Sequence, residues 1–275
     1  MIFTEEGKND ESALMFKKVK MNTDFEFTNE NDQLMSPFNN LKSGFCAAVI
    51  GPQNSGKSTS VINLLSRGRF KGQRRSLKGI FDSITVVSPS LHTIDDNIFE
   101  KIPDIFKHKQ LTADVLLGYN DMLEQQLDEE NDHKIDDKNN KNLKKKVIKR
   151  DPILNLLILD DVGSSIRKKE NKELFETLVL NRRHTNTSIL MCLQNYFQIP
   201  NSVRNNLSFL FIYKPKDISE EKKIFALTKM KPKFMDNFFK QFYRKKTDVM
   251  LIDMTLRESA DYIFYRNFKK INFEI

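Results

Sequence analysis

The feature that most constrains this chain is a glycine-rich loop placed between a strand and a helix. Residues 51–58 read GPQNSGKS, which is the complete G-x-x-x-x-G-K-[ST] pattern. A short apolar run at 46–50 predicts a strand before it, and apolar residues at helical spacing across 61–65 predict a helix behind it. The alternative is an ordinary glycine turn that opens a helix. The flanking strand and helix favour a loop that binds nucleotide phosphates.

The loop offers several groups that suit a phosphate chain. Gly51 and Gly56 can adopt backbone conformations that a side chain would block, so the loop can turn its N–H groups inward. The following helix adds free N–H groups and the positive end of its dipole. Lys57 can reach the β- and γ-phosphates, the Ser58 hydroxyl can ligate Mg²⁺, and Thr59 supports the turn. The predicted nucleotide-binding set is Gly51, Pro52, Gln53, Asn54, Ser55, Gly56, Lys57, Ser58 and Thr59.

A second motif follows about a hundred residues later, where a continuous apolar run at 154–159 ends in two carboxylates. Such a run predicts a strand buried on both faces of a parallel sheet. Ligands of open α/β sheets bind at the carboxyl ends of the strands, which is where Asp160 and Asp161 would lie. We therefore expect Asp160 to bind Mg²⁺ and Asp161 to act as the general base for water. Two acidic residues that merely open a loop are the alternative.

Polar residues behind this motif extend the candidate site. The strand predicted at 188–193 stops at Gln194, an amide that can sense a γ-phosphate or position water. Three arginines are candidates for an arginine finger in a multimer or for an intramolecular γ-phosphate contact. A surface arginine that fixes a loop is the third possibility, and the sequence does not rank the candidates, which are Arg182, Arg183 and Arg204.

Composition sets wider limits. A chain of 275 residues suits one large α/β domain with extensions, and 39% hydrophobic residues suffice for a core. The formal net charge of +8 permits a polyanionic partner such as nucleic acid, but solvated lysine runs would explain it equally well. Cys46 and Cys192 fall in predicted strands, so we expect buried reduced thiols. Their spacing indicates no disulfide framework and no zinc site.

The sequence shows neither a typical signal peptide nor a typical membrane-spanning segment. The polar start, MIFTEEGKNDES, is not typical of a signal peptide. No apolar run approaches the roughly 18 residues of a membrane helix. We therefore expect a soluble intracellular protein that does not bind a membrane.

The chain divides into three predicted parts. Residues 1–40 form an N-terminal extension with a hint of an edge strand around Phe25 and Phe27, and residues 41–213 form the core. Within the core, the charged stretch 128–151 predicts a flexible insertion loop, whose basic end either meets DNA or is merely solvated. Residues 214–275 form a C-terminal extension of helices and strands that packs on the core. Other predicted elements are a basic loop at 67–75, a strand within 80–89, a helical region at 91–127 interrupted at Pro103, a helix at 164–182 capped by Ser164 or Ser165, and strands at 207–213, 248–253 and 262–268.

Residues 214–246 combine many lysines with aromatic residues. Basic residues interleaved with aromatics can bind single-stranded nucleic acid by stacking. We favour the simpler interpretation, an amphipathic helix with phenylalanines on the core and lysines in water.

Taken in order, these motifs resemble the poxvirus-type genome-packaging ATPases of large DNA viruses and virophages, in the FtsK–HerA superfamily of P-loop NTPases. The resemblance covers roughly 44–213 well and the flanks loosely. The superfamily often has Asp-Glu where this chain has Asp160-Asp161. The matching pieces are GPQNSGKS (51–58), ITVVSP (84–89), LLILDD (156–161), RRHTNTSILMCLQN (182–195) and IPNSVRNN (199–206).

The resemblance implies a fold and a set of roles. The fold is an additional-strand, RecA-like α/β P-loop NTPase with a mainly parallel sheet, flanking helices and antiparallel C-terminal strands. In it, the Gln194 strand lies between the P-loop strand and the Asp160 strand. Lys57 binds phosphate, Asp160 binds Mg²⁺, Asp161 activates water and Gln194 senses the nucleotide. Arg183 or Arg204 then acts across a subunit boundary.

The resemblance also implies an activity and partners. The chain would hydrolyse ATP with Mg²⁺ as a homo-oligomeric ring, a hexamer, that passes double-stranded DNA through its centre. It would load viral DNA into capsids together with capsid proteins, at assembly sites in the host cytoplasm.

Two other classes of function remain as alternatives. A P-loop small-molecule or nucleoside kinase would transfer phosphate to an acceptor, although no acceptor-binding signature is evident. A DNA-binding protein with a vestigial nucleotide site would not need the intact Gly56-Lys57-Ser58 and Asp160-Asp161. The sequence lacks an N-K-x-D guanine signature and an L-S-G-G-Q motif, which argues against GTPases and ABC-type ATPases.

Overall fold

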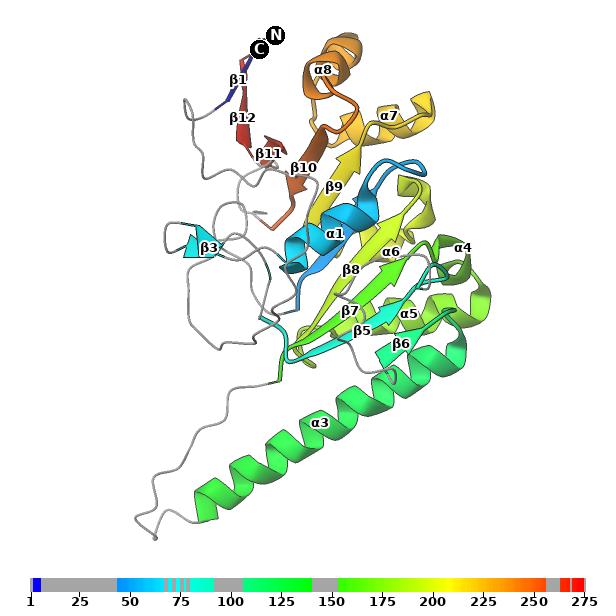
Figure 1. The fold of residues 1–275 in the computed structure, drawn as a ribbon, viewed down its shortest axis with the longest axis vertical. Helices are drawn as coiled ribbons and strands as arrows, with labels where there is room; N and C mark the ends of the chain where they lie inside the picture. The colour runs from blue at the N-terminus through cyan, green and yellow to red at the C-terminus, as the bar shows by residue number, and fades with distance from the viewer. Residues whose placement is uncertain are drawn as a thin grey trace.

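The computed structural model describes residues 2–5, 44–66, 69–70, 73–74, 77, 80–91, 106–139, 153–255, 263–267 and 269–274. Its centre is a ten-stranded sheet with the order β1-β12-β11-β10-β9-β2-β8-β7-β5-β6 (Figure 1). The strands are β1 (Ile2–Glu5), β2 (Cys46–Ile50), β5 (Ser83–Val87), β6 (Lys107–His108), β7 (Asn155–Asp160), β8 (Thr187–Leu193), β9 (Phe209–Tyr213), β10 (Val249–Asp253), β11 (Ile263–Arg266) and β12 (Lys269–Glu274).

One half of this sheet, from β9 to β6, is parallel. β8 pairs with β2 on one side and with β7 on the other, so Cys192 of β8 lies opposite both Val49 and Asp160. Every side chain of β2, β7, β8 and β9 is buried, as continuous apolar runs predict for a sheet covered on both faces. This order confirms the predicted additional-strand fold. It also brings the carboxyl ends of β2, β8 and β7 to one edge.

The other half is antiparallel. β10 pairs with β9, β11 with β10, β12 with β11 and β1 with β12. The strands predicted at 248–253 and 262–268 are confirmed, and they both extend the sheet and pair with each other. β1 and β12 were not predicted, and their pairing places the two ends of the chain side by side (Figure 1).

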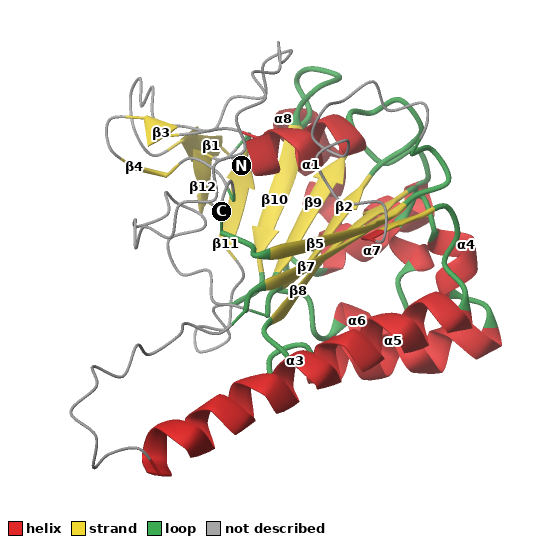
Figure 2. Cartoon of the chain, turned by 60° about the horizontal axis from the view of Figure 1, so that its bottom comes forward, coloured by secondary structure: helices red, strands yellow, loops and turns green. Residues whose placement is uncertain are grey.

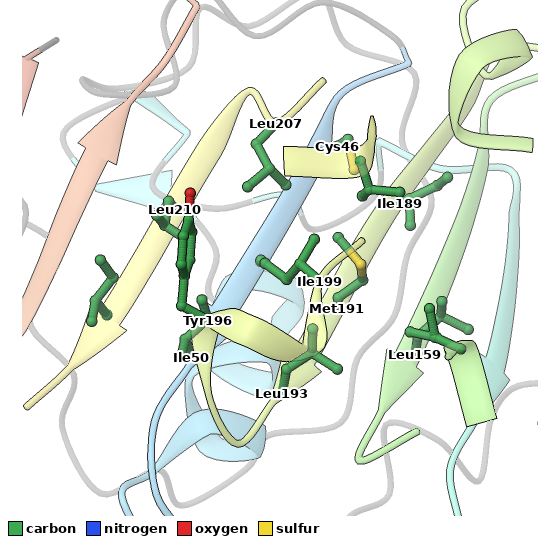
Figure 3. Close-up of a cluster of buried hydrophobic side chains, with 14 of the residues drawn as sticks. Cys46, Ile50, Leu159, Ile189, Met191, Leu193, Tyr196, Ile199, Leu207 and Leu210 are labelled. Carbon is green, nitrogen blue, oxygen red and sulfur yellow. The ribbon is translucent and has the colours of Figure 1, made fainter. Parts of the chain in front are cut away.

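Helices cover the two faces of the sheet unequally. α1 (Lys57–Ser66) packs on one face through Val61, Leu64 and Leu65. The opposite face carries a larger apolar cluster, in which Tyr196 and Ile199 cover the sheet (Figure 3). α3 and α5 run together on that side (Figure 2). The remaining helices are α3 (Ala113–Asn139), α4 (Gly163–Ile166), α5 (Lys169–Asn181), α6 (Asn201–Arg204), α7 (Ile218–Ala226) and α8 (Met235–Phe242), with short 3₁₀ turns η4 (Tyr196–Gln198) and η5 (Pro232–Phe234).

The first part of the charged stretch 128–151 is helical, although a loop was predicted. A loop was predicted from residue 128, but α3 continues to Asn139. The helix is nucleated by buried Leu116, Tyr119 and Leu123, after which each further residue costs little to add. Residues 140–152, which include the basic end of the stretch, lie outside the described residues.

The helix predicted at 164–182 is also different. It is two helices, α4 and α5, and neither begins at a capping serine: the residues before them are Val162 and Lys168, and neither side chain makes a cap hydrogen bond. The carbonyl of Ser165 instead accepts from the Asn171 side chain at 2.9 Å. This contact satisfies the backbone where one helix stops and the next begins.

Several smaller predictions can be placed as well. Both cysteines are buried and free, as predicted. The basic loop at 67–75 contains a two-stranded pair, β3 (Arg69–Phe70) with β4 (Gln73–Arg74). The helical region predicted at 91–127 includes the short strand β6, which periodicity could not indicate in two residues. The edge strand around Phe25 and the break at Pro103 lie outside the described residues. None of the described helices is long and apolar enough to cross a membrane.

Candidate active site

The glycine-rich loop between β2 and α1 is shaped by close contacts and by left-handed backbone. A Cβ on Gly51 would come within 2.7 Å of Tyr213 Cβ and 2.6 Å of Ser55 Oγ, so only glycine fits there. Asn54 and Gly56 have φ angles of 61° and 101°. The Ser55 hydroxyl is buried and has no hydrogen-bond partner among the described residues. Because such a group is costly unless a ligand satisfies it, the loop suits a bound anion.

Lys57 begins α1 and folds back over the loop. Its ammonium donates to the carbonyl oxygens of Gly51 at 2.8 Å and Pro52 at 2.9 Å. Burial lowers the pKa of this ammonium, and the nearby Asp160 and Asp161 carboxylates oppose that shift. A phosphate chain offers charged acceptors that are stronger than neutral carbonyls. The side chain is thus held at the loop by bonds that a nucleotide can replace.

A tyrosine at the end of β9 supports the loop from below. The Tyr213 hydroxyl contacts Ser60 Oγ and donates to the Gly56 carbonyl at 3.2 Å. Ser60 Oγ also donates to the Gly56 carbonyl, at 2.8 Å. Tyr213 was not predicted as a site residue, because it lies more than 150 residues from the loop and no local pattern links the two. Its phenol restrains the glycine that turns the loop into the helix.

Asp160 lies at the end of β7 with both carboxylate oxygens engaged. Ser58 Oγ donates to its Oδ1 at 3.3 Å and Ser88 Oγ donates to its Oδ2 at 3.0 Å. Burial raises the pKa of Asp160, while the two hydroxyls act in the opposite direction. Ser88 follows β5 and was part of a matching motif, but no role was predicted for it.

The residues present fit a magnesium ion. A hydroxyl from Ser58 and a carboxylate from Asp160 are hard oxygen donors, which Mg²⁺ prefers. Mg²⁺ keeps several waters and takes only one or two protein groups beside phosphates. Across the part of the chain that the structure describes, no group of three or more His, Cys, Asp or Glu residues could hold a metal by itself.

Asp161 and Gln194 meet directly beside Asp160. The Gln194 side-chain amide donates to Asp161 Oδ1 at 2.8 Å, and both residues are exposed at the carboxyl edge of the sheet. Asp161 has a φ of 52°, a conformation that costs free energy in a residue other than glycine. Its backbone N–H donates to the Cys192 carbonyl at 3.0 Å. The backbone therefore turns the carboxylate out of the strand and toward the amide of the neighbouring strand.

The segment after Gln194 is held in place by hydrogen bonds and by a close contact with Gly163. Gln198 Oε1 accepts from the backbone N–H of Gln194 at 2.7 Å, and the Gln198 side chain lies so close to Gly163 that a Cβ there would come within 2.6 Å. On the other side, Glu220 of α7 accepts from the Tyr196 N–H at 2.6 Å. Gln198 and Glu220 were not predicted as site residues, because only the tertiary structure brings them to this segment.

The three candidate arginines lie away from the loop. Arg182 is buried and donates to the Asn206 carbonyl at 3.0 Å, so it ties α5 to the turn after α6. Arg183 is exposed beside Gly44, two residues before β2, so the whole length of that five-residue strand, about 16 Å, separates it from the loop. Arg204 stacks over the Tyr196 ring at 4.6 Å, on the face opposite α1. Neither the Arg182 nor the Arg183 contact involves the phosphate loop.

A family sequence model and several solved structures are similar to this chain. The sequence model of the family described as "Poxvirus A32 protein" matches residues 36–270, a range that contains the loop, both carboxylates and Gln194. No curated protein sequence matches the chain.

Solved structures similar to this one include viral and plasmid proteins. The DNA-packaging ATPase B204 from Sulfolobus turreted icosahedral virus is 12% identical, with a TM-score of 0.48 over 82% of this chain and 98% of that chain. The genome-packaging NTPase B204 from Sulfolobus turreted icosahedral virus 2, in complex with ATP-γS, is 12% identical, with a TM-score of 0.47 over 86% and 100%. The pCW3 conjugation coupling protein TcpA is 13% identical, with a TM-score of 0.44 over 81% and 60%.

Proposed function

Since this chain belongs to the poxvirus A32 protein family, we propose that it hydrolyses ATP to drive double-stranded viral DNA into capsids. The observation that carries the proposal is the hydrogen bond between Gln194 and Asp161 beside the phosphate loop. A carboxylate held at the sheet edge by an amide suits the activation of water. This favours hydrolysis over transfer to a small-molecule acceptor, as a kinase would require.

The hydrolytic step uses groups that the fold already holds together. The loop N–H groups and Lys57 bind the β- and γ-phosphates, which keeps the γ-phosphorus at the sheet edge. Asp161 orients a water molecule and accepts its proton as the water oxygen bonds to the γ-phosphorus. The bond to the β–γ bridging oxygen breaks, and ADP and phosphate are the products. Gln194 holds the Asp161 carboxylate and contacts the γ-phosphate.

Ser58 and Asp160 would hold Mg²⁺ at this site. When bound, the ion neutralises charge on the phosphate oxygens as it builds up in the transition state. Ser88 fixes the orientation of the Asp160 carboxylate.

The proposal includes a ring of identical subunits, a hexamer by resemblance, with capsid proteins as partners at viral assembly sites in the host cytoplasm. Arg183 and Arg204 enter it as groups that act on a neighbouring subunit. Arg183 is exposed at the edge opposite its own loop, which is consistent with contact across a boundary. Arg204 is partly exposed beside the aromatic pair Tyr196 and Phe197.

The first test is ATP hydrolysis by the purified protein with and without long duplex DNA. Lys57→Ala should lower turnover by about 100-fold or more, because a charged contact to the transferring phosphoryl group is lost. Lys168→Ala, which removes an exposed lysine before α5, is the matched control and should retain turnover. DNA-stimulated hydrolysis at the wild-type rate in the Lys57 variant would refute the proposed function.

A further inference from the structure

One stretch of the described chain carries a large excess of positive charge. Residues 214–246 contain eleven lysines and arginines and four acidic residues, a formal net charge of +7, compared with +8 for the whole chain. We call this stretch the basic segment. It begins directly after β9 and includes α7, η5, α8 and the turn into β10.

The structure separates the charged and aromatic residues of the basic segment completely. All eleven cationic side chains are exposed; they are Lys214, Lys216, Lys222, Lys223, Lys229, Lys231, Lys233, Lys240, Arg244, Lys245 and Lys246. The aromatic side chains lie in the core or partly within it. Phe238 and Phe242 are fully buried, and Phe234 is partly covered by Lys233, whose ammonium lies 5.0 Å from the ring centroid.

This separation discriminates between two ways of binding nucleic acid. Single strands are held by stacking bases on exposed aromatic rings. Because the rings of the basic segment pack inward, they cannot serve as stacking platforms. Exposed ammonium and guanidinium groups can still neutralise phosphates, and this contact is independent of base sequence.

The acidic residues of the segment do little to offset its charge. Glu220 is buried, and its carboxylate accepts from the Tyr196 N–H. Glu221 is partly exposed, and Asp217 accepts from the Ser219 N–H at 2.8 Å. With Asp236, at most three acidic groups face water beside eleven cations. The surface therefore has a strongly positive field.

The basic segment lies at the same edge of the sheet as the candidate active site. Lys214 directly follows Tyr213, whose hydroxyl donates to the Gly56 carbonyl of the phosphate loop. α7 and α8 lie above the carboxyl end of β9 (Figure 1). The Glu220–Tyr196 hydrogen bond joins α7, which carries Lys222 and Lys223, to the segment that follows Gln194. A ligand on α7 thus has a short physical route to the site of hydrolysis.

We propose that the basic segment is the surface on which this chain holds duplex DNA, through phosphate contacts without base readout. The inference rests on the proposed function, since it names where the motor grips its substrate. Contacts to phosphate alone suit a motor that must move along any sequence.

The test is the salt dependence of DNA binding, measured by fluorescence anisotropy with a fluorescein-labelled duplex of mixed sequence. The patch variant is Lys222→Gln, Lys223→Gln and Lys240→Gln, in α7 and α8. The control variant is Lys109→Gln, Lys168→Gln and Lys169→Gln, which removes three exposed lysines outside the basic segment. Both variants change the net charge equally, and glutamine keeps good helix propensity.

Each phosphate contact contributes about 0.9 to the slope of log K against log salt concentration. If the three lysines each contact one phosphate, the slope of the patch variant falls by about 2.7. From about 50 to 200 mM KCl, the wild type and the control should lose roughly 40-fold more affinity than the patch variant. Duplex should bind at least as tightly as single-stranded oligonucleotide of the same length.

Three results would overturn the inference: equal slopes for all three proteins, equally reduced slopes for both variants, or a preference for single-stranded oligonucleotide. ATP hydrolysis without DNA, measured on the same samples, separates this inference from the proposed function. If the motor assignment is wrong, hydrolysis is missing in all three proteins. If only the inference is wrong, hydrolysis is intact and the slopes do not distinguish the patch variant.

Discussion

At the scale of single residues, Ser88 shows how one proton decides the geometry of the Asp160 carboxylate. Its hydroxyl accepts from the Ser90 N–H at 3.1 Å, which occupies one lone pair. Its only proton is therefore directed to Asp160 Oδ2, at 3.0 Å. The other oxygen, Oδ1, is left facing Ser58. Ser88 thus positions the carboxylate that faces Ser58.

This arrangement predicts that Ser88→Ala weakens the response to Mg²⁺. Loss of a hydrogen bond that orients a metal ligand typically costs about 10-fold or more in metal affinity. We expect the Mg²⁺ concentration at half-maximal binding of a fluorescent ATP analogue to rise by about 10-fold. Ser88→Thr keeps a hydroxyl and should restore most of the affinity. A Ser88→Ala midpoint equal to that of the wild type would show that Asp160 does not need this hydrogen bond.

At the scale of elements, α7 is joined to the turn after β8 by a buried carboxylate. Glu220 is 5% exposed and accepts from the Tyr196 N–H at 2.6 Å. Burial raises its pKa above the usual 4.5, the hydrogen bond opposes this, and Asp217 and Glu221 add to the increase. Between the ordinary pKa and the raised one, the folded protein therefore binds more protons than the unfolded chain.

The sign of this shift predicts how stability depends on pH. Stability due to the neutral carboxyl is present below pH 4.5 and is lost as pH rises through the folded pKa. Glu220→Gln keeps an acceptor oxygen and removes the charge, so its stability should decline less over the same range. Thermal unfolding near pH 4.5 should give similar midpoints for the two proteins, and at neutral pH the variant should have the higher midpoint.

Glu173→Gln, which removes an exposed carboxylate from α5, is the control for net charge in that experiment. A Glu220→Gln variant that follows the wild-type curve at every pH would show that the buried carboxylate does not limit stability.

At the scale of the whole molecule, aromatic packing joins the C-terminal helices to the sheet. Phe238 of α8 is fully buried and contacts Phe225 of α7, Phe242 of α8 and Phe264 of β11. The centroid distances of these pairs are 5.4, 4.8 and 6.3 Å. The parallel half of the sheet carries the candidate active site. The basic segment is fixed to it through β9 and this aromatic cluster.

Removing the centre of this cluster should therefore loosen the molecule as a whole. Phe238→Ala should lower the free energy of unfolding by about 3–5 kcal/mol, because a large buried side chain is replaced by a cavity. Phe238→Leu, which fills more of the space, should cost clearly less. Urea unfolding followed by circular dichroism measures both values. A loss below about 1 kcal/mol for the alanine variant would show that the cluster is not a single packed unit.

Some of this architecture could be predicted because its signals are local. The glycine-rich loop and the apolar run ending at Asp160 can each be recognised within about ten residues of sequence. The P-loop strand, its helix and the buried parallel strands were therefore predicted from residue spacing. The inward side of α8 was indicated in the same way, by phenylalanines at helical spacing. The end of α3 was missed because the sequence from Asp128 onward is polar and has no apolar periodicity that would indicate a helix.

Taken alone, the sequence predicted a set of groups that bind phosphate and activate water: Lys57, Ser58, Asp160, Asp161 and Gln194. Only the tertiary structure decided what surrounds them. Ser88 lies 72 residues from its partner Asp160 in the sequence, and Tyr213 lies 153 residues from its partner Ser60. Such contacts are set by the order of strands in the sheet, which no periodicity encodes. The same strand order places Arg183 at the edge of the sheet opposite the phosphate loop. It places the basic segment at the edge that carries the loop.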